Sequence, residues 1–325
     1  MFMGPALEFK MRPGDVNMNV DISIVSPVFN EQENLLSLFN GIKKNIPAQY
    51  AWEFILVDDG STDSSREIIR QLCFDNDNVK AVFLSKNFGH QIALSAGLDH
   101  AKGRAVITLD SDLQHPPESI PQMLRVWEGG AQIILGVRED SANLSWLKKA
   151  TSWGFYALLK IITHLDLIEG AADFRLLDRK VVECLRQYRE RDRFLRGIIS
   201  DMGFHREVIF YKENVRSGGV VKYNLFKMIR LAITGVVSFS SFPLRVCSAI
   251  GIVISFLSLL YAAAIVYDKI VNGAPTGIAS ILVGVFFIGG VQLFFIGILG
   301  EYLMTIFKEV KARPLYNVAE VIKIN

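Results

Sequence analysis

Two carboxylates, Asp110 and Asp112, stand two residues apart at the end of the apolar run 105–110. Two such groups repel each other unless a cation compensates their charge. Mg²⁺ prefers one or two carboxylates completed by substrate phosphates and water. Gln114 adds a neutral oxygen nearby. The spacing therefore predicts a site where a divalent cation holds a diphosphate.

Polar groups also follow two other apolar runs, in residues 26–31 and in residues 58–61. No GxGxxG motif and no Walker P-loop accompanies them, so the two common phosphate cradles are absent from the sequence. His90, His100, His115, His164 and His205 lack the spacing of a metal cluster, and we interpret them as structural or solvent-facing. The three cysteines show no CxxC spacing and are expected to be reduced, buried thiols.

The positioning elements follow from hydrophobic periodicity. Apolar runs predict strands at 22–28, 54–58, 79–84, 105–110 and 132–136. Helices are predicted from Glu31 to about Asn45, with Asn30 and Glu33 as a capping box, after Ser61, and around 90–101. Apolar strands separated by amphipathic helices predict a mostly parallel α/β sheet covered on both faces. Ligands of such sheets bind at the carboxyl ends of the strands.

Half of the residues are hydrophobic, which is high for a soluble protein. No charge occurs from Val246 to Tyr267, a length that spans roughly 33 Å as a helix. After a polar turn at 268–273, a second uncharged run extends from Ala274 to Gly300. Two transmembrane helices are therefore predicted, at 244–267 and 274–300; two buried core helices are the alternative.

Basic residues flank the outer ends of both runs, whereas the turn between them pairs Asp268 with Lys269. The positive-inside rule then places the domain that precedes the two runs and both termini in the cytoplasm. Residues 224–243 predict an amphipathic helix in the interface, or a core-facing helix as the alternative. We assign 1–19 to a disordered leader, 20–223 to the catalytic domain and 301–325 to a cytoplasmic tail. The net charge of +2 indicates no nucleic-acid partner.

The segments 25–35, 57–63, 87–91 and 110–118, read together, resemble the inverting family-two glycosyltransferases of the GT-A fold. Within that family the chain is similar to polyisoprenyl-phosphate glycosyltransferases, and most similar to the bactoprenol glucosyltransferase branch. The resemblance covers about residues 21–313, including both apolar runs. It implies a Rossmann-like catalytic domain on the cytoplasmic side of the bacterial inner membrane, which acts on a polyprenyl phosphate as part of cell-envelope glycosylation. We also expect a homo-oligomer.

The resemblance implies roles residue by residue. The nucleotide sugar would be bound by Pro27, Val28, Phe29, Glu31, Val57, Asp59, Asp110, Ser111, Gln114 and Arg138. Mg²⁺ or Mn²⁺ would be held by Asp110, Asp112 and Gln114. Catalytic roles would fall to Asp173, Asp112, Arg216 and Lys222, and the lipid phosphate would meet Lys148, Lys149, Arg216 and Lys222. Val221 stands where the family often has Ser before the lysine, which puts one hydroxyl contact in doubt.

The function implied is transfer of glucose from UDP-glucose to undecaprenyl phosphate with inversion. The same reaction with GDP-mannose or a UDP-aminoarabinose is the alternative. A processive polysaccharide synthase is disfavoured by only two apolar runs and no QxxRW motif. A non-enzymatic lipid-binding scaffold is disfavoured because the acidic motifs are intact.

Overall fold

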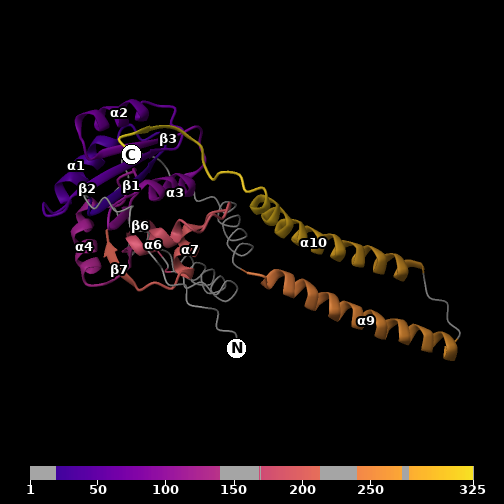
Figure 1. Cartoon of the computed structure of the whole chain (residues 1–325). Helices are drawn as coiled ribbons and strands as arrows, with labels where there is room; N and C mark the ends of the chain where they lie inside the picture. Colours follow the sequence, from indigo (N-terminus) through magenta and orange to yellow (C-terminus); the bar gives the residue numbers. More distant parts are fainter. Residues whose placement is uncertain (1–19, 140–167, 169, 213–239, 273–277, 325) are drawn as a thin grey trace.

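A computed structural model describes residues 20–139, 168, 170–212, 240–272 and 278–324 (Figure 1). Within them lies an eight-stranded sheet of order β7-β5-β6-β4-β1-β2-β3-β8. The strands are β1 Ile22–Val28, β2 Trp52–Asp58, β3 Val79–Leu84, β4 Ala105–Thr108, β5 Ile133–Arg138, β6 Ala171–Asp178, β7 Arg206–Tyr211 and β8 Val318–Ile322. The predicted mostly parallel, helix-covered sheet is confirmed.

Helices cover both faces of the sheet. One layer contains α1 Leu35–Asn45, α2 Ser65–Asp75, η1 Pro117–Ser119 and α4 Ile120–Glu128; the other contains α3 His90–His100, α6 Arg179–Leu185 and α7 Leu195–Asp201. Side chains alternate between the two cores: Phe54 and Leu56 of β2 face the first layer, and Ile55 and Val57 face the second. Burial on both faces explains why the strands read as continuous apolar runs.

The strand order creates a crevice beside β1. Strands β2 and β3 add to one side of β1, and the chain then returns to place β4 on the other side, all four being parallel. This reversal is the point where open α/β sheets bind ligands. Strand β6 runs antiparallel between β4 and β5, so its first residues lie at the edge where β4 ends.

Helix α3 lies close against β1 and β2 because Gly97 has no side chain. A Cβ at this position would lie 2.2 Å from Cγ1 of Val25 and 3.0 Å from Cγ2 of Val57. The close packing fixes the amino end of α3, at His90, beside the ends of the parallel strands.

The predicted capping box is wrong. Helix α1 begins only at Leu35, and its N-cap residue Asn34 makes no capping hydrogen bond through its side chain. Asn30 instead has a left-handed backbone, with φ 57°, and its Oδ1 accepts a hydrogen bond of 2.8 Å from the Thr62 N–H. Its side chain therefore joins two loops at the sheet edge.

The two apolar runs form the helices α9 Phe242–Asn272 and α10 Ile278–Val310, which extend away from the sheet domain (Figure 1). Both are long and apolar enough to cross a membrane. The predicted turn at 268–273 is wrong for residues 268–272, because nothing before Gly273 breaks the helix and α9 continues to Asn272. Helix α10 likewise continues past the predicted boundary at Gly300. Residues 1–19 and 224–239 lie outside the described residues.

The end of the chain returns to the sheet domain. Strand β8 pairs antiparallel with β3, with Val82 opposite Val321. Tyr316 Oη donates a hydrogen bond of 2.8 Å to Asp99, and Arg70 forms an ion pair of 2.7 Å with Glu320. Residues 301–325 were predicted to be a cytoplasmic tail, and strand β8 was not predicted.

Candidate active site

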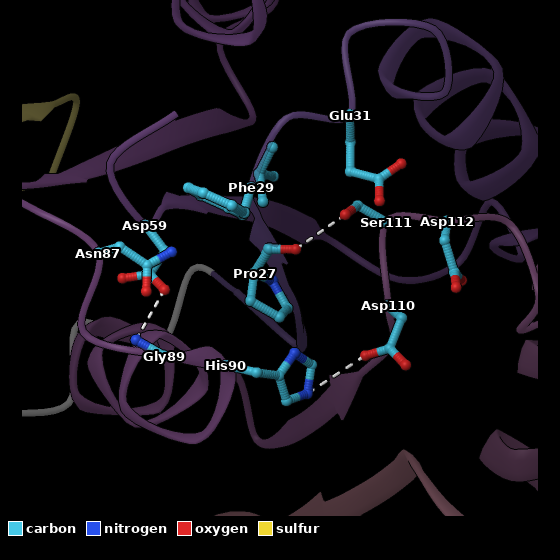
Figure 2. Close-up of a pocket in the computed structure, with 11 residues that line it drawn as sticks. Pro27, Phe29, Glu31, Asp59, Asn87, Gly89, His90, Asp110, Ser111 and Asp112 are labelled. Carbon is cyan, nitrogen blue, oxygen red and sulfur yellow. Dashed lines mark hydrogen bonds and ion pairs between the residues drawn. The ribbon is translucent and has the colours of Figure 1, made fainter. Parts of the chain in front are cut away.

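A pocket of ≈ 310 Å³ opens at the carboxyl ends of the parallel strands (Figure 2), at the low end of the roughly 300–1,000 Å³ usual for ligand pockets. It is lined by Pro27, Val28, Phe29, Glu31, Asp59, Asn87, Gly89, His90, Asp110, Ser111 and Asp112. These residues come from the end of β1, from the loops after β1, β2, β3 and β4, and from the first residue of α3. Segments separated by about 80 residues in the sequence thus form one wall.

The acidic loop after β4 is held by its own polar groups. Ser111 Oγ donates a hydrogen bond of 2.9 Å to the Pro27 carbonyl (Figure 2), and Asp112 Oδ1 accepts one of 3.1 Å from the Gln114 N–H. Between them Leu113 has φ 64°, a left-handed conformation that non-glycine residues rarely adopt. Such backbone strain persists where surrounding contacts impose it, and it is common at functional sites.

Buried His115 supports the same loop from beneath. Its Nδ1 accepts a hydrogen bond of 3.0 Å from the Asp110 N–H, and its ring stacks on Phe174. Burial lowers the pKa of His115, outweighing the nearby carboxylates. A neutral imidazole with Nδ1 as acceptor fits this hydrogen bond.

Asp59 links the loop after β2 to the amino end of α3. Its two carboxylate oxygens accept hydrogen bonds from the Phe88 N–H, at 2.7 Å, and the Gly89 N–H, at 2.9 Å. Gly60, with φ 76°, allows this approach, because a Cβ there would lie 2.6 Å from the Asn87 nitrogen. Burial raises the pKa of Asp59, and the two N–H donors oppose that shift.

His90 lies between two carboxylates at the floor of the pocket. Its Nε2 is 3.4 Å from Asp110 Oδ1 (Figure 2) and 3.3 Å from Asp173 Oδ2. Burial by itself lowers the pKa of His90. The carboxylates of Asp173 and Asp110 raise that pKa by more than burial lowers it, so it lies above its usual value. The sequence predicted a structural or solvent-facing His90; its side chain is 42% exposed, but its place in the pocket lining was not predicted. Its position directly after a strand-end loop was the available signal.

Asp173 reaches the site because β6 is antiparallel. Its backbone carbonyl accepts a hydrogen bond of 2.6 Å from Thr108 Oγ1 of β4. Its buried carboxylate is paired with Arg175 and accepts a hydrogen bond of 2.9 Å from Gln91 Nε2. Burial raises the pKa of Asp173, but Arg175, His90 and Arg196 outweigh it and hold that pKa well below its usual range. Asp173 therefore stays ionised and pairs with the cationic side chains around it.

The chemistry of the donor set limits how a metal could bind. Asp110 and Asp112 line the same pocket, and burial raises the pKa of Asp110. Within the described residues, no group of three or more His, Cys, Asp or Glu side chains is arranged to hold a metal ion. The two carboxylates fit a cation such as Mg²⁺ that takes its remaining ligands from substrate phosphates and water.

Other predicted site residues lie elsewhere. Val57 was predicted to line the nucleotide site, and this prediction is wrong. Its side chain is fully buried in the core beneath α3. Gln114 is half-buried beside Asp112, and Arg138 is exposed where β5 ends; neither belongs to the pocket lining. The predicted basic residues Lys148, Lys149, Arg216 and Lys222 lie outside the described residues.

The part of the chain that forms this site matches a known protein family. Residues 23–186, which carry all the strand-end loops above, match the family described as glycosyl transferase family 2. The chain belongs to that family. This glycosyltransferase therefore has the enzyme class that the resemblance implied.

Several relatives resemble this glycosyltransferase along nearly their whole length. The SfII prophage-derived bactoprenol glucosyl transferase of Shigella flexneri is 41% identical over 297 residues, covering 91% of this chain and 96% of the relative. An uncharacterised glycosyltransferase of Synechocystis is 39% identical over 305 residues, covering 93% and 96%. The prophage bactoprenol glucosyl transferase homologue of Escherichia coli is 38% identical over 304 residues, covering 93% and 99%. The similarity thus includes the apolar helices.

Proposed function

We propose that this glycosyltransferase moves glucose from UDP-glucose to undecaprenyl phosphate, or a similar polyprenyl phosphate, at the cytoplasmic face of a bacterial inner membrane. The supporting observation is the 41% identity, over 91% of the chain, to a protein named as a bactoprenol glucosyl transferase. Bactoprenol is a polyprenyl lipid, and an enzyme that uses it must work at a membrane surface. The apolar helices α9 and α10 supply a matching anchor.

The pocket suits the nucleotide end of the donor. Phe29 presents a ring that is 45% exposed at the rim, where it can stack on a base. Asp59 accepts two backbone hydrogen bonds and, with up to four lone-pair sites on a carboxylate, can also accept an imide N–H of uracil. Asp110 and Asp112, assisted by Gln114, would hold Mg²⁺ or Mn²⁺. That cation would neutralise charge on the departing diphosphate.

The reaction is one displacement at the anomeric carbon. An oxygen of the acceptor phosphate forms the new C1–O bond as the bond from C1 to the diphosphate breaks, so the configuration inverts and UDP leaves. The acceptor is a phosphate monoester whose second pKa is about 6, so at neutral pH it attacks as a dianion and no proton has to be removed. Asp173, ionised and paired with Arg175, is suited to orienting groups rather than to accepting a proton.

A donor screen tests the proposal. Purified protein in detergent with undecaprenyl phosphate and Mg²⁺ is given UDP-glucose, GDP-mannose or a UDP-aminoarabinose, and the lipid product is identified by mass spectrometry. We expect the mass of glucose on the lipid with UDP-glucose. Turnover of GDP-mannose alone would refute the donor and leave the reaction class standing. The predicted homo-oligomer is checked on the same sample by light scattering.

A further inference from the structure

Arg196 is a cation beside the site, and its sequence context does not distinguish it from other arginines. It stands at the start of α7, and its side chain is 41% exposed. Its Nε lies 3.3 Å from Asp173 Oδ1, and its Nη2 lies 3.5 Å from Oδ2. The carboxylate thus holds the guanidinium through two of its nitrogens. Because a guanidinium carries five N–H donors in a planar fork, one arginine can bind a carboxylate and a phosphate together.

Asp173 has a second, buried cation for its charge. Arg175 is 2% exposed and pairs with the same carboxylate from within the sheet. The two arginines therefore differ in access: Arg175 is sealed in the core, whereas Arg196 reaches solvent at the sheet edge. Of this pair, only Arg196 can meet an anion that arrives from outside.

The position of Arg196 relative to the pocket favours the acceptor over the donor. Neither Arg196 nor Asp173 lines the pocket of Phe29 and Asp59. His90 connects the two regions, because it lines the pocket and also contacts Asp173. Arg196 is therefore connected to the pocket through Asp173 and His90 and does not line it.

The segment leading into α7 is attached to the apolar helix α10. Lys308 of α10 forms an ion pair of 2.7 Å with Asp192, and Glu309 Oε1 accepts a hydrogen bond of 2.7 Å from the Arg191 N–H. These contacts lie four and five residues before Arg196 in the sequence. The segment from Arg191 to Arg196 therefore connects the end of a candidate membrane span to the reaction centre. A lipid phosphate would approach from the side of that span.

We propose that Arg196 binds the phosphate of the polyprenyl phosphate acceptor, and that Asp173 is the positioning residue that orients its guanidinium. This inference rests on the proposed function. It adds a phosphate-binding residue on α7 to the basic residues that the sequence predicts. An arginine can take two phosphate oxygens with parallel N–H donors, whereas a lysine acts as a point charge.

The test measures acceptor and donor separately in R196Q and R196K. Initial rates are taken against undecaprenyl phosphate at saturating UDP-glucose, and UDP binding in the presence of Mg²⁺ is measured by calorimetry. We expect R196Q to raise the acceptor KM about 10- to 100-fold, the range for losing a hydrogen bond to a charged group. R196K should recover part of the loss, and the UDP Kd should stay within about twofold.

Arg104→Gln is the matched control. Arg104 is another exposed arginine near a carboxylate, 3.7 Å from Asp21, but it stands before β4, at the opposite edge of the sheet. The R104Q variant should leave the acceptor KM and the UDP Kd unchanged. An unchanged acceptor KM in folded R196Q, or an equal loss of UDP binding, would overturn the inference. Should R196Q fail to fold by thermal melting, R196K carries the same two measurements. A wild-type enzyme that binds UDP but glycosylates no polyprenyl phosphate would instead refute the proposed function, and this inference with it.

Discussion

At the scale of single residues, the carboxylates of the site differ in their surroundings. Asp173 meets buried Arg175 and half-exposed Arg196, which keep it ionised. Asp110 and Asp112 face the pocket, where burial raises the pKa of Asp110. A partly buried carboxylate that faces a pocket can bind an arriving cation, because the cation compensates a charge that is costly to bury. The different environments therefore support different roles, a metal ligand and a structural anchor for cations.

The metal role is tested by Asp110→Asn and Asp112→Asn. Each replaces a charged ligand by a neutral amide of similar size at the rim of the pocket, so transfer should fall by at least about 100-fold, as expected when a charged contact worth roughly 3 kcal/mol is lost. The melting temperature should change little. Excess EDTA should abolish the wild-type rate, and added Mg²⁺ or Mn²⁺ should restore it. Near-normal turnover in EDTA would exclude the metal.

Asp173→Asn tests whether a proton has to be removed. The depressed pKa keeps Asp173 ionised throughout the working range, and the acceptor is already a dianion above about pH 6. The wild-type rate should therefore fall below about pH 6 as the acceptor takes up a proton. The variant should be strongly impaired at every pH. Recovery of its activity between pH 7 and 9 would identify Asp173 as a general base.

At the scale of elements, strand β8 is the unexpected part. It closes the β3 edge of the sheet with residues that follow the apolar helices. Ile322 packs against the first core and Tyr316 against the second, so the returning chain contributes to both layers. Burial raises the pKa of Tyr316, with Asp99 adding to the shift, so its hydroxyl stays a donor to Asp99. Strand β3 is thereby protected from pairing with other chains, and β8 becomes the edge strand of the described sheet.

Two substitutions on β8 compare its core-facing side with its exposed side. Ile322→Ala removes a partly buried side chain and should cost about 1 kcal/mol, less than the roughly 2–5 kcal/mol for a fully buried site. The melting temperature in detergent should then fall by about 2–4 °C for a domain of this size. Val321→Ala is the matched control, because Val321 is 45% exposed on the same strand, and it should be nearly neutral. Equal effects of the two would contradict the pairing of β8 with β3.

At the scale of the whole molecule, α9 and α10 leave the sheet domain and return to it. Tyr302 Oη of α10 donates a hydrogen bond of 2.7 Å to the carbonyl of Ser240, two residues before α9 begins. Beyond α10, β8 enters the same sheet as the catalytic loops. Both ends of this helix pair therefore lie beside one domain. This arrangement is compatible with the prediction that both flanks lie on the same side of a membrane, and it does not indicate which side.

Cysteine labelling tests that topology. In a background in which Cys73, Cys184 and Cys247 are replaced, a cysteine introduced at Asn272 should react with an impermeant reagent from outside intact cells. One introduced at Asn325 should react only after the cells are opened. The basic flanks and the shared domain give the same expectation, because both place Asn272 alone at the far end. Labelling in the reverse pattern would overturn it.

Local patterns in the sequence were enough for several features. The predicted strands at 22–28 and 79–84 match β1 and β3, because side-chain polarity directly encodes which residues are buried. The acidic residues 110 and 112 were expected at a strand end, where parallel strands expose their last residues. Two long apolar helices were expected because uncharged runs of this length have few other stable environments.

Tertiary packing decided the rest. Nothing local indicates that β6 runs against β4 and brings Asp173 beside His90, or that β8 returns to β3 after two helices. The pairing partner of a strand and its direction depend on how the whole chain packs, not on its own pattern. Val57 illustrates the limit: it precedes the acidic pair Asp58-Asp59, yet its side chain points into the core, because successive residues of a strand face opposite sides of the sheet. Arg196 became visible only when the fold placed α7 between the reaction centre and α10.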